Sequence, residues 1–468
     1  MARQAGESRS PDALDAFRQF FALERDVLVL SVAMFAFSLG FQMTSRYLAE
    51  YMIALGAGTV VVGLYGTFSN VISAVYPYPG GAVSDRIGSR YALTLFGLLS
   101  TVGFAIWLVS PAFGALAVPL VFVGLVFAQA WKSFGLGATF AVVKQAVPPA
   151  RLAEGFASTE TFRRTAFLIG PLLAAGIFAV VGTNGTSGAG GAGATASMTN
   201  TAMIEAFSSV LAVAVVFAAL GTLAQHLLYD SEGDTLGAAF EGFSQVVADL
   251  RALPPELRPL LISDTLVRFA NGMVYVFFVI VVTRFLGVGF SADLPIVGSV
   301  TLSPQAYFGV LLGIEMAVAL ASMVPVARLA RRVGLKPVVA LGFAVYAVFP
   351  ALLVTAPADA GVLALLFAVS GLRFAGLPAH KALVVGPAER DAGGRVTGSY
   401  YLVRNVVVTP SAALGGVIYG GLALPGVGQV IAGSPTLAFG AATVIGLLGT
   451  GYFLVHGEEF GPYASDNE

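Results

Sequence analysis

Long apolar runs alternate with short polar connections along almost the whole chain. A helix of about 20 apolar residues crosses the hydrocarbon core of a bilayer and satisfies its own backbone hydrogen bonds there. Runs of this length therefore predict transmembrane helices joined by short loops. Twelve such runs are found, at residues 27–49, 59–80, 91–110, 115–143, 155–181, 203–228, 257–286, 304–327, 337–356, 361–385, 396–421 and 434–456.

The composition supports the same interpretation. Of the 468 residues, 57% are hydrophobic and 11% are charged, whereas soluble domains carry about 25% charged residues. With no cysteine and three scattered histidines, neither a disulfide, a metal site nor a cofactor is expected. The net charge of −1 gives no indication of a nucleic-acid partner. We predict an all-α integral membrane protein embedded in the lipid bilayer.

The basic residues orient the predicted helices. Most of the 25 lysines and arginines lie in connections that face the cytoplasm if the N-terminus does, and such an excess marks the inner side of a membrane. We therefore expect a multi-pass protein of the cell membrane with both termini cytoplasmic and a flexible outer connection at 182–202. The expected organisation is an N-terminal segment at 1–25, a six-helix bundle at 26–228, a linker with an interfacial helix at 229–256, a second six-helix bundle at 257–457 and a tail at 458–468.

The second half of the chain repeats the first weakly, at an offset of about 240 residues. Arg164 in the fifth run corresponds to Arg404 in the eleventh. A charged turn at 81–90 has a degraded counterpart at 327–336, which keeps the glycine and the final base. Two parallel halves of this kind are a known plan of transporters.

The turn between the second and third runs reads Gly81-Ala-Val-Ser-Asp85-Arg86-Ile-Gly88-Ser-Arg90. Its spacing resembles the loop signature of the major facilitator superfamily of secondary transporters. Leu48-Ala-Glu-Tyr51 at the end of the first run, and Ile169-Gly170-Pro171 in the fifth, are also similar to that family. The resemblance extends over nearly the whole chain.

The resemblance implies twelve helices in two pseudo-symmetric six-helix bundles. It implies a secondary transporter that moves a small organic solute by alternating access, as a monomer, coupled to protons or another ion, with export as one possible direction. It also implies that the turn gates the inner side, through Gly81, Asp85, Arg86, Gly88 and Arg90.

The sequence also bears on two other classes of protein, enzymes and membrane sensors. The chain lacks the motifs of a zinc protease, a serine hydrolase and an ATP-driven pump, so no enzymatic activity is expected. The alternative to a transporter is a membrane sensor or receptor with the same fold, which would bind its ligand without moving it.

Ionised side chains within the predicted helices are the candidates for function, because each costs about 3 kcal/mol or more when it faces lipid. Asp264, Arg268 and Asn271 form one polar stripe along the seventh run. The Asp264–Arg268 and Glu160–Arg164 spacings also allow i,i+4 pairs that only fix helix packing. In the family, helices one, four, seven and ten line the central cavity, which implies as cavity residues Gln42, Lys132, Asp264, Arg268, Asn271 and Arg373.

Two further hypotheses concern coupling and solute charge. Glu315 and Asp264 are the deepest acids, and Glu315 ranks first as a proton carrier because no basic residue lies within a helical turn of it. Arg164 and Arg404 could approach one anionic solute from both halves. Alternatively, each arginine stabilises a polar network within its own bundle. His380 is expected at the inner end of the tenth run, reaching toward the interface.

Overall fold

The computed structural model describes residues 25–76, 83, 86–133, 152–184, 197–230, 251, 253–294, 298–385, 393–424 and 428–459. Several predicted features lie outside these residues. They are the N-terminal segment up to residue 24, Gly81 and Asp85 of the gating turn, most of the outer connection 182–202, most of the linker 229–256, and the tail from residue 460.

The first half of the chain forms one group of helices, which we call the N-bundle. Helix α2 packs against α9 and α10, and α6 packs against α7 and α10. A short 3-10 turn, η1 (Ser110–Leu116), joins α6 to α7, and Gly114 with φ = 53° allows the chain to bend there. The helices are α2 (Arg25–Ser45), α3 (Leu48–Ala54), α4 (Thr59–Val75), α6 (Ser89–Val109), α7 (Ala117–Ala128), α9 (Leu152–Asn184) and α10 (Asn200–Leu228).

The second half forms the C-bundle, in which α20 packs against α12 and α15, and α14 against α16. Helix α12 continues through the short turns η4, α13 and η5, so the seventh run is irregular beyond Val274. The elements are η3 (Pro255–Leu257), α12 (Arg258–Val274), η4 (Tyr275–Phe277), α13 (Phe278–Ile280), η5 (Val281–Phe285), α14 (Pro304–Val333), α15 (Leu335–Val354), α16 (Ala360–Ala375), α17 (Leu377–Val385), α18 (Gly393–Val408), α19 (Ser411–Gly420) and α20 (Pro435–His456).

The helices confirm the prediction of an all-α membrane protein. Ten stretches of the described chain are long and apolar enough to cross a membrane. One of them, Ser89–Ser133, contains both α6 and α7, and the 17-residue α4 is a shorter apolar helix. Each predicted apolar run overlaps at least one helix, while the exact number of twelve spans stays a prediction.

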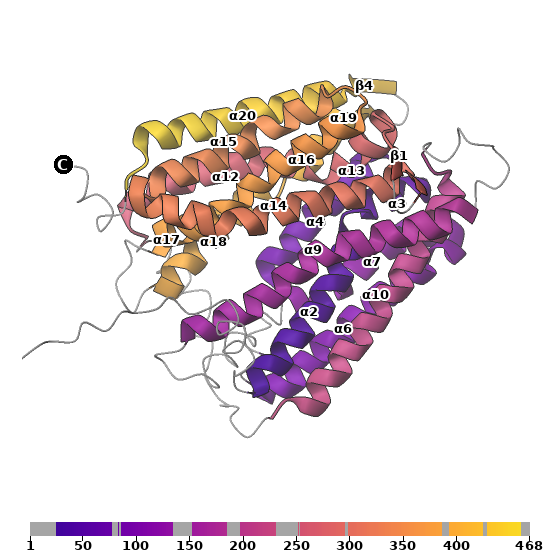
Figure 1. The fold of residues 1–468 in the computed structure, drawn as a ribbon, viewed down its shortest axis with the longest axis horizontal. Helices are drawn as coiled ribbons and strands as arrows, with labels where there is room; N and C mark the ends of the chain where they lie inside the picture. Colours follow the sequence, from indigo (N-terminus) through magenta and orange to yellow (C-terminus); the bar gives the residue numbers. More distant parts are fainter. Residues whose placement is uncertain are drawn as a thin grey trace, which may run out of the picture.

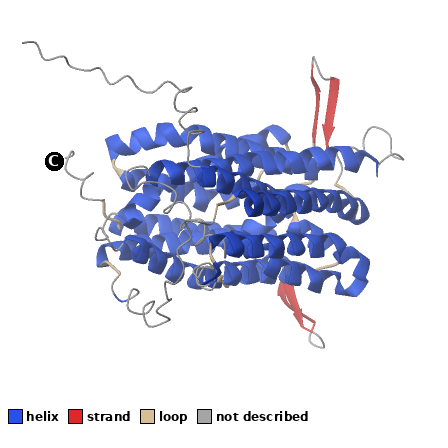
Figure 2. Cartoon of the chain, turned by 90° about the horizontal axis from the view of Figure 1, so that it is seen from below, coloured by secondary structure: helices blue, strands red, loops and turns tan. Residues whose placement is uncertain are grey.

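Two antiparallel hairpins interrupt the C-bundle, and the sequence analysis did not predict them. Strands β1 (Phe290–Leu294) and β2 (Gly298–Leu302) precede α14, and strands β3 (Gly421–Leu424) and β4 (Gly428–Ala432) precede α20. Figure 2 shows both hairpins projecting from the helical body near the same end. These strands are four or five residues long, too short for an alternating pattern to stand out between two apolar runs.

The two bundles meet closely at one end of the molecule. A Cβ atom added to Gly63 of α4 would lie 2.5 Å from the carbonyl oxygen of Ala412 in α19, so these backbones are in contact. Gly309 of α14 is equally tight against the Pro171 carbonyl of α9. Figure 1 shows the helices of the two bundles converging at this end and diverging toward the other. We call the end that contains α3, η5 and the start of α14 the joined end.

Capping residues fix where the helices begin at the joined end. Helices α10, α14, α16 and α20 all start there, and each has a side-chain oxygen that accepts a hydrogen bond from the backbone in its first turn. Such caps satisfy amide groups that the helix itself leaves unpaired. The capping residues are Thr199, Ser303, Asp359 and Ser434.

The glycine near the end of the turn and the glycine of its predicted counterpart have similar backbone angles. Gly88 precedes α6 with φ = 85° and ψ = 152°, and Gly334 precedes α15 with φ = 90° and ψ = 170°. Only glycine adopts such angles without strain. The repeat found in the sequence therefore has a structural basis at these two positions.

Gly63→Ala is expected to disrupt the joined end, because its methyl group would collide with the Ala412 carbonyl and push α4 away from α19. The chain has no cysteine, so spin labels can be placed at Ala112→Cys and Ala358→Cys, two exposed positions at the joined end of the N- and C-bundle. The distance between the labels should increase or become bimodal. Gly176→Ala, where an added Cβ meets nothing within 4 Å, is the matched control, and an unchanged distance in Gly63→Ala would refute the contact.

Candidate functional site

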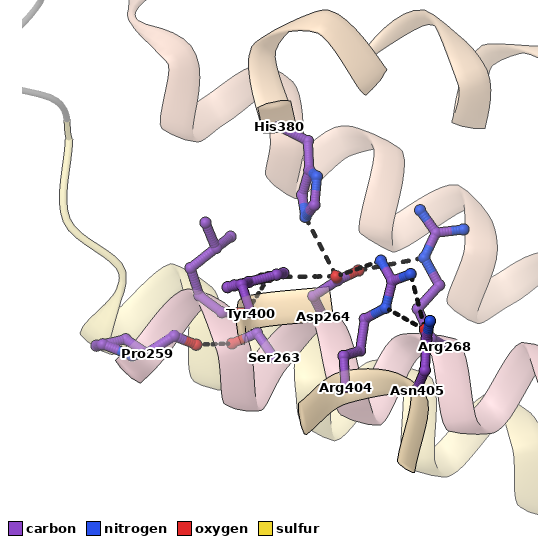
Figure 3. A network of polar contacts seen from close by, with 9 residues as sticks. Pro259, Ser263, Asp264, Arg268, His380, Tyr400, Arg404 and Asn405 are labelled. Atoms are coloured by element: carbon purple, nitrogen blue, oxygen red, sulfur yellow. Dashed lines mark hydrogen bonds and ion pairs between the residues drawn. The ribbon is translucent and has the colours of Figure 1, made fainter. Parts of the chain in front are cut away.

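The centre of the C-bundle polar network is Asp264, whose side chain is completely buried on α12. Its Oδ1 atom accepts a hydrogen bond from Arg268 Nε at 3.2 Å. Its Oδ2 atom accepts hydrogen bonds from Arg404 Nη1 at 3.1 Å and from the Tyr400 hydroxyl at 3.2 Å. Figure 3 shows these donors converging on one carboxylate from α12 and α18. One buried anion thus holds two arginines, which is the arrangement a charge needs away from water.

His380 is a third basic neighbour of this carboxylate. Its Nε2 atom lies 3.3 Å from Asp264 Oδ2, and its side chain is buried. The imidazole also packs edge-on against Phe343 and Tyr400. The expectation that His380 reaches toward the membrane surface is therefore wrong, because α17 turns this side chain into the bundle.

The two arginines of this network remain partly exposed, in contrast to Asp264. The side chain of Arg268 is 22% exposed and that of Arg404 is 18% exposed. Each guanidinium also stacks on a tyrosine, Arg268 over Tyr346 and Arg404 over Tyr401, both at 4.6 Å. The predicted i,i+4 pair between Asp264 and Arg268 is formed, and Arg404 joins it. Both arginines thus keep part of their surface exposed.

Glu315 forms a second buried ion pair, with Arg373. Arg373 Nη2 lies 2.7 Å from Glu315 Oε1, and both side chains are almost completely buried. The Ser370 hydroxyl donates to the same oxygen. Glu315 has no basic residue within a helical turn on α14, but Arg373 of α16 pairs with it. The reason for ranking Glu315 first as a proton carrier therefore no longer holds. Arg373 is likewise enclosed by aromatic rings and does not present an open face.

The N-bundle contributes cations of its own. Lys132 follows α7 and is exposed, with its Nζ atom 4.2 Å above the ring of Phe41 in α2. The guanidinium of Arg46 lies 4.2 Å over the ring of Tyr275, which belongs to the C-bundle. The positive charges of Arg46 and Arg163 are close enough to repel that of Lys132. In the described part of the chain, the contacts of Lys132 and Arg46 are with aromatic rings and not with carboxylates.

The remaining predicted cavity residues take different positions. The Cβ atom of Gln42 packs against Gly170 of α9, and Gln42 is half-buried. The Asn271 Oδ1 atom is buried and has no hydrogen-bond donor among the described residues. Arg164 is half-buried on α9. Its role as a partner of Arg404 in solute binding stays a prediction.

Three residues of the predicted gate are described. Arg86 is exposed, Gly88 starts α6 as noted above, and Arg90 Nε donates to the His226 carbonyl of α10 at 2.9 Å. Arg90 thus ties α6 to the end of α10. The gating role of these residues stays a prediction.

A buried polar network at the joined end was missed by the sequence analysis. Glu50 of α3 accepts a hydrogen bond from the Gln305 side-chain amide at 2.8 Å and lies 3.5 Å from Arg284 Nε. Tyr47 in turn donates to the Gln305 carbonyl at 3.0 Å. Glu50 and Tyr47 belong to the N-bundle, whereas Arg284 and Gln305 belong to the C-bundle. The partners are more than 200 residues apart, so only the fold brings them together.

Comparison with known proteins decides the family. The sequence profile described as Major Facilitator Superfamily matches residues 30–412. The chain belongs to the major facilitator superfamily. The fold predicted from the turn and its flanking motifs is thereby confirmed.

Two curated relatives within the superfamily support this assignment. Uncharacterised MFS-type transporters of two Mycobacterium tuberculosis strains, H37Rv and CDC 1551, are each 27% identical over 165 residues. The matched segment covers 34% of this chain and 37% of either relative.

Solved structures of superfamily transporters share the fold over nearly the full length. A nucleoside transporter superposes with a TM-score of 0.68 at 12% identity, covering 92% of this chain and 100% of that one. A POT family transporter in complex with 5-aminolevulinic acid gives 0.67 at 14% identity, with 94% and 99% covered. A bacterial homologue of the iron transporter ferroportin gives 0.65 at 12% identity, with 93% and 99% covered. At these identities the likeness establishes the fold alone.

Asp264→Asn is expected to destabilise the C-bundle, because it leaves Arg268, Arg404 and His380 around a neutral amide. Loss of one partner from a buried ion pair costs about 3–5 kcal/mol in soluble proteins, so the melting temperature in detergent should fall clearly. Asp293→Asn, on exposed strand β1, should melt like the wild type. If Asp264→Asn melts like the wild type as well, the carboxylate does not hold the network together.

Proposed function

We propose that the protein is a secondary transporter that carries a small organic solute across the membrane by alternating access. The observation that carries this proposal is the polarity of the bundle contact. Polar side chains buried between the bundles hold one end together, while the helices diverge toward the other. This joint combines hydrogen bonds and a partly exposed ion pair with apolar packing, such as the ring of Tyr47 against Phe308, and interfaces of this kind separate when two domains rotate apart.

The basic side chains support an anionic group on the solute. Arg268 and Arg404 share the single carboxylate of Asp264 and keep part of their surface accessible. Arg46 of the N-bundle reaches the ring of Tyr275 in the C-bundle. Lys132 lies close enough to Arg46 for the two positive charges to repel each other. An excess of cations away from bulk water is stabilised by a bound anion, and the planar fork of arginine suits a carboxylate or a phosphate. The aromatic rings beside these cations suit the organic part of such a solute.

Coupling to protons is the second part of the proposal. Asp264 and Glu315 are both paired with arginines in this conformation, so the charge of each carboxylate is compensated within the C-bundle. Proton uptake by either acid would therefore have to accompany a rearrangement of its ion pair. Glu315 has no advantage over Asp264 once Arg373 is taken into account.

Transport can be tested without knowing the solute in advance. Thermal-shift screening of the purified protein against carboxylates, phosphates, amines and neutral metabolites would identify ligands, and counterflow in proteoliposomes would show whether they move. We expect ligands with an anionic group and counterflow that saturates. Saturable binding without counterflow would identify a sensor or receptor on the same fold.

Arg404→Gln should weaken binding of such an anionic ligand about tenfold or more, because hydrogen bonds to charged groups contribute about 1.5–3 kcal/mol. Isothermal titration of the purified variant measures this directly. Arg332→Gln, at the exposed end of α14, is the matched control and should bind like the wild type. Equal affinity in wild type and Arg404→Gln, with melting temperature preserved, would make Arg404 a structural residue only.

A further inference from the structure

Glu50 differs from the other buried acids in where it lies and in how incompletely it is paired. Its side chain is completely buried at the contact between the bundles. Its Oε1 atom accepts a hydrogen bond from the Gln305 side-chain amide. Its Oε2 atom is buried and has no hydrogen-bond donor at suitable geometry among the described residues. An ionised carboxylate with one unpaired, water-excluded oxygen is costly, whereas a protonated one is not.

The cation next to Glu50 compensates this cost only in part. Arg284 Nε lies 3.5 Å from Oε1, and the Arg284 side chain is 31% exposed. Its Nη2 atom is engaged elsewhere, donating to Asn200 Oδ1 of α10 at 3.1 Å. Solvent and Asn200 therefore share the guanidinium with Glu50, and a partly exposed pair gives little stabilisation.

Tyr47, Thr283 and Gln305 also face Glu50 in the described chain, and all three are neutral. The phenol of Tyr47 lies at the start of α3 and donates its proton to the Gln305 carbonyl. From η5, the Thr283 hydroxyl donates to the Val279 carbonyl, and from α14 comes the Gln305 amide. Burial raises the pKa of the Glu50 carboxyl, and Gln305, Arg284 and Thr283 lower it by less. Geometry and electrostatics thus agree that the Glu50 carboxyl binds a proton more readily in the joined state than in water.

We infer that Glu50 is a proton-binding site that closes the joined end, taking up a proton when the two bundles come together there. The inference rests on the proposed alternating access, because Glu50 must reach water when the joined end opens. In water the carboxyl has its ordinary pKa, and in the joined state its pKa is higher. A group whose pKa rises on closing stabilises the closed form below its open-state pKa, and this stabilisation is lost as pH increases through the raised value. Acid therefore favours the joined state, and alkali favours opening.

The direct test follows the joined end as a function of pH in the absence of any solute. Labels at Ala112→Cys and Ala358→Cys in nanodiscs report its distance distribution by double electron–electron resonance. The fraction with the short distance should fall as pH increases, because the ionised carboxylate is costly in the joined state. Glu50→Gln, which has the shape of the protonated acid, should keep the short-distance fraction at the acid value over the whole range.

Two further variants separate titration from packing. Arg284→Gln removes the cation that favours the ionised form, so the midpoint of the transition should move upward by about half a pH unit. Glu205→Gln alters an exposed acid on α10 near the same end and should titrate like the wild type. A merely structural role of Glu50 would change the populations in Glu50→Gln but leave their pH dependence in place.

The outcomes distinguish this inference from the proposed function. A wild-type distribution that does not change with pH, or a pH dependence that persists in Glu50→Gln, overturns the role of Glu50. In either case, a joined end that still opens when solute is added leaves alternating access standing. A joined end that opens under no condition contradicts alternating access itself.

Discussion

A charge inside this protein must find its partner within the protein, because the surrounding bilayer cannot solvate it. Asp264 satisfies this constraint with two arginines and a histidine from three helices, and Glu315 does so with Arg373. Both networks lie within the C-bundle and hold its helices together. They make the bundle a unit whose internal charges need not separate when the bundle moves as a whole.

At the contact between the bundles, the buried charge is less completely paired. Glu50 has a neutral amide and a shared, partly exposed guanidinium as partners, and close glycine contacts bring α4 against α19 and α9 against α14. A fully paired carboxylate would fix the joined end, and an apolar joint would expose a large surface on opening. The observed mixture suits an interface that forms and separates repeatedly. The cations Lys132 and Arg46 of the N-bundle and Arg268 and Arg404 of the C-bundle account for the proposed preference for an anionic solute.

The sequence predicted those features for which all the residues involved lie in one helix or one turn. The apolar runs predicted the helices, the i,i+4 spacing predicted the Asp264–Arg268 pair, and the repeated turn predicted that Gly88 and Gly334 are equivalent. It was insufficient where the partner comes from another helix. Arg373 beside Glu315, His380 beside Asp264 and Gln305 beside Glu50 are brought together only by packing. The hairpins were missed because a few strand residues between two long apolar runs leave no readable alternation.

The central claim is that the two bundles move against each other around a solute, so that one end opens as the other closes. A second label pair, at Leu228→Cys and Val333→Cys, reports the end opposite the joined end, where both positions are exposed on α10 and α14. Adding a ligand found by thermal shift should lengthen the joined-end distance in part of the population and shorten the opposite distance in the same fraction. Unchanged distances at both ends with ligand bound would contradict alternating access and leave a binding protein with this fold.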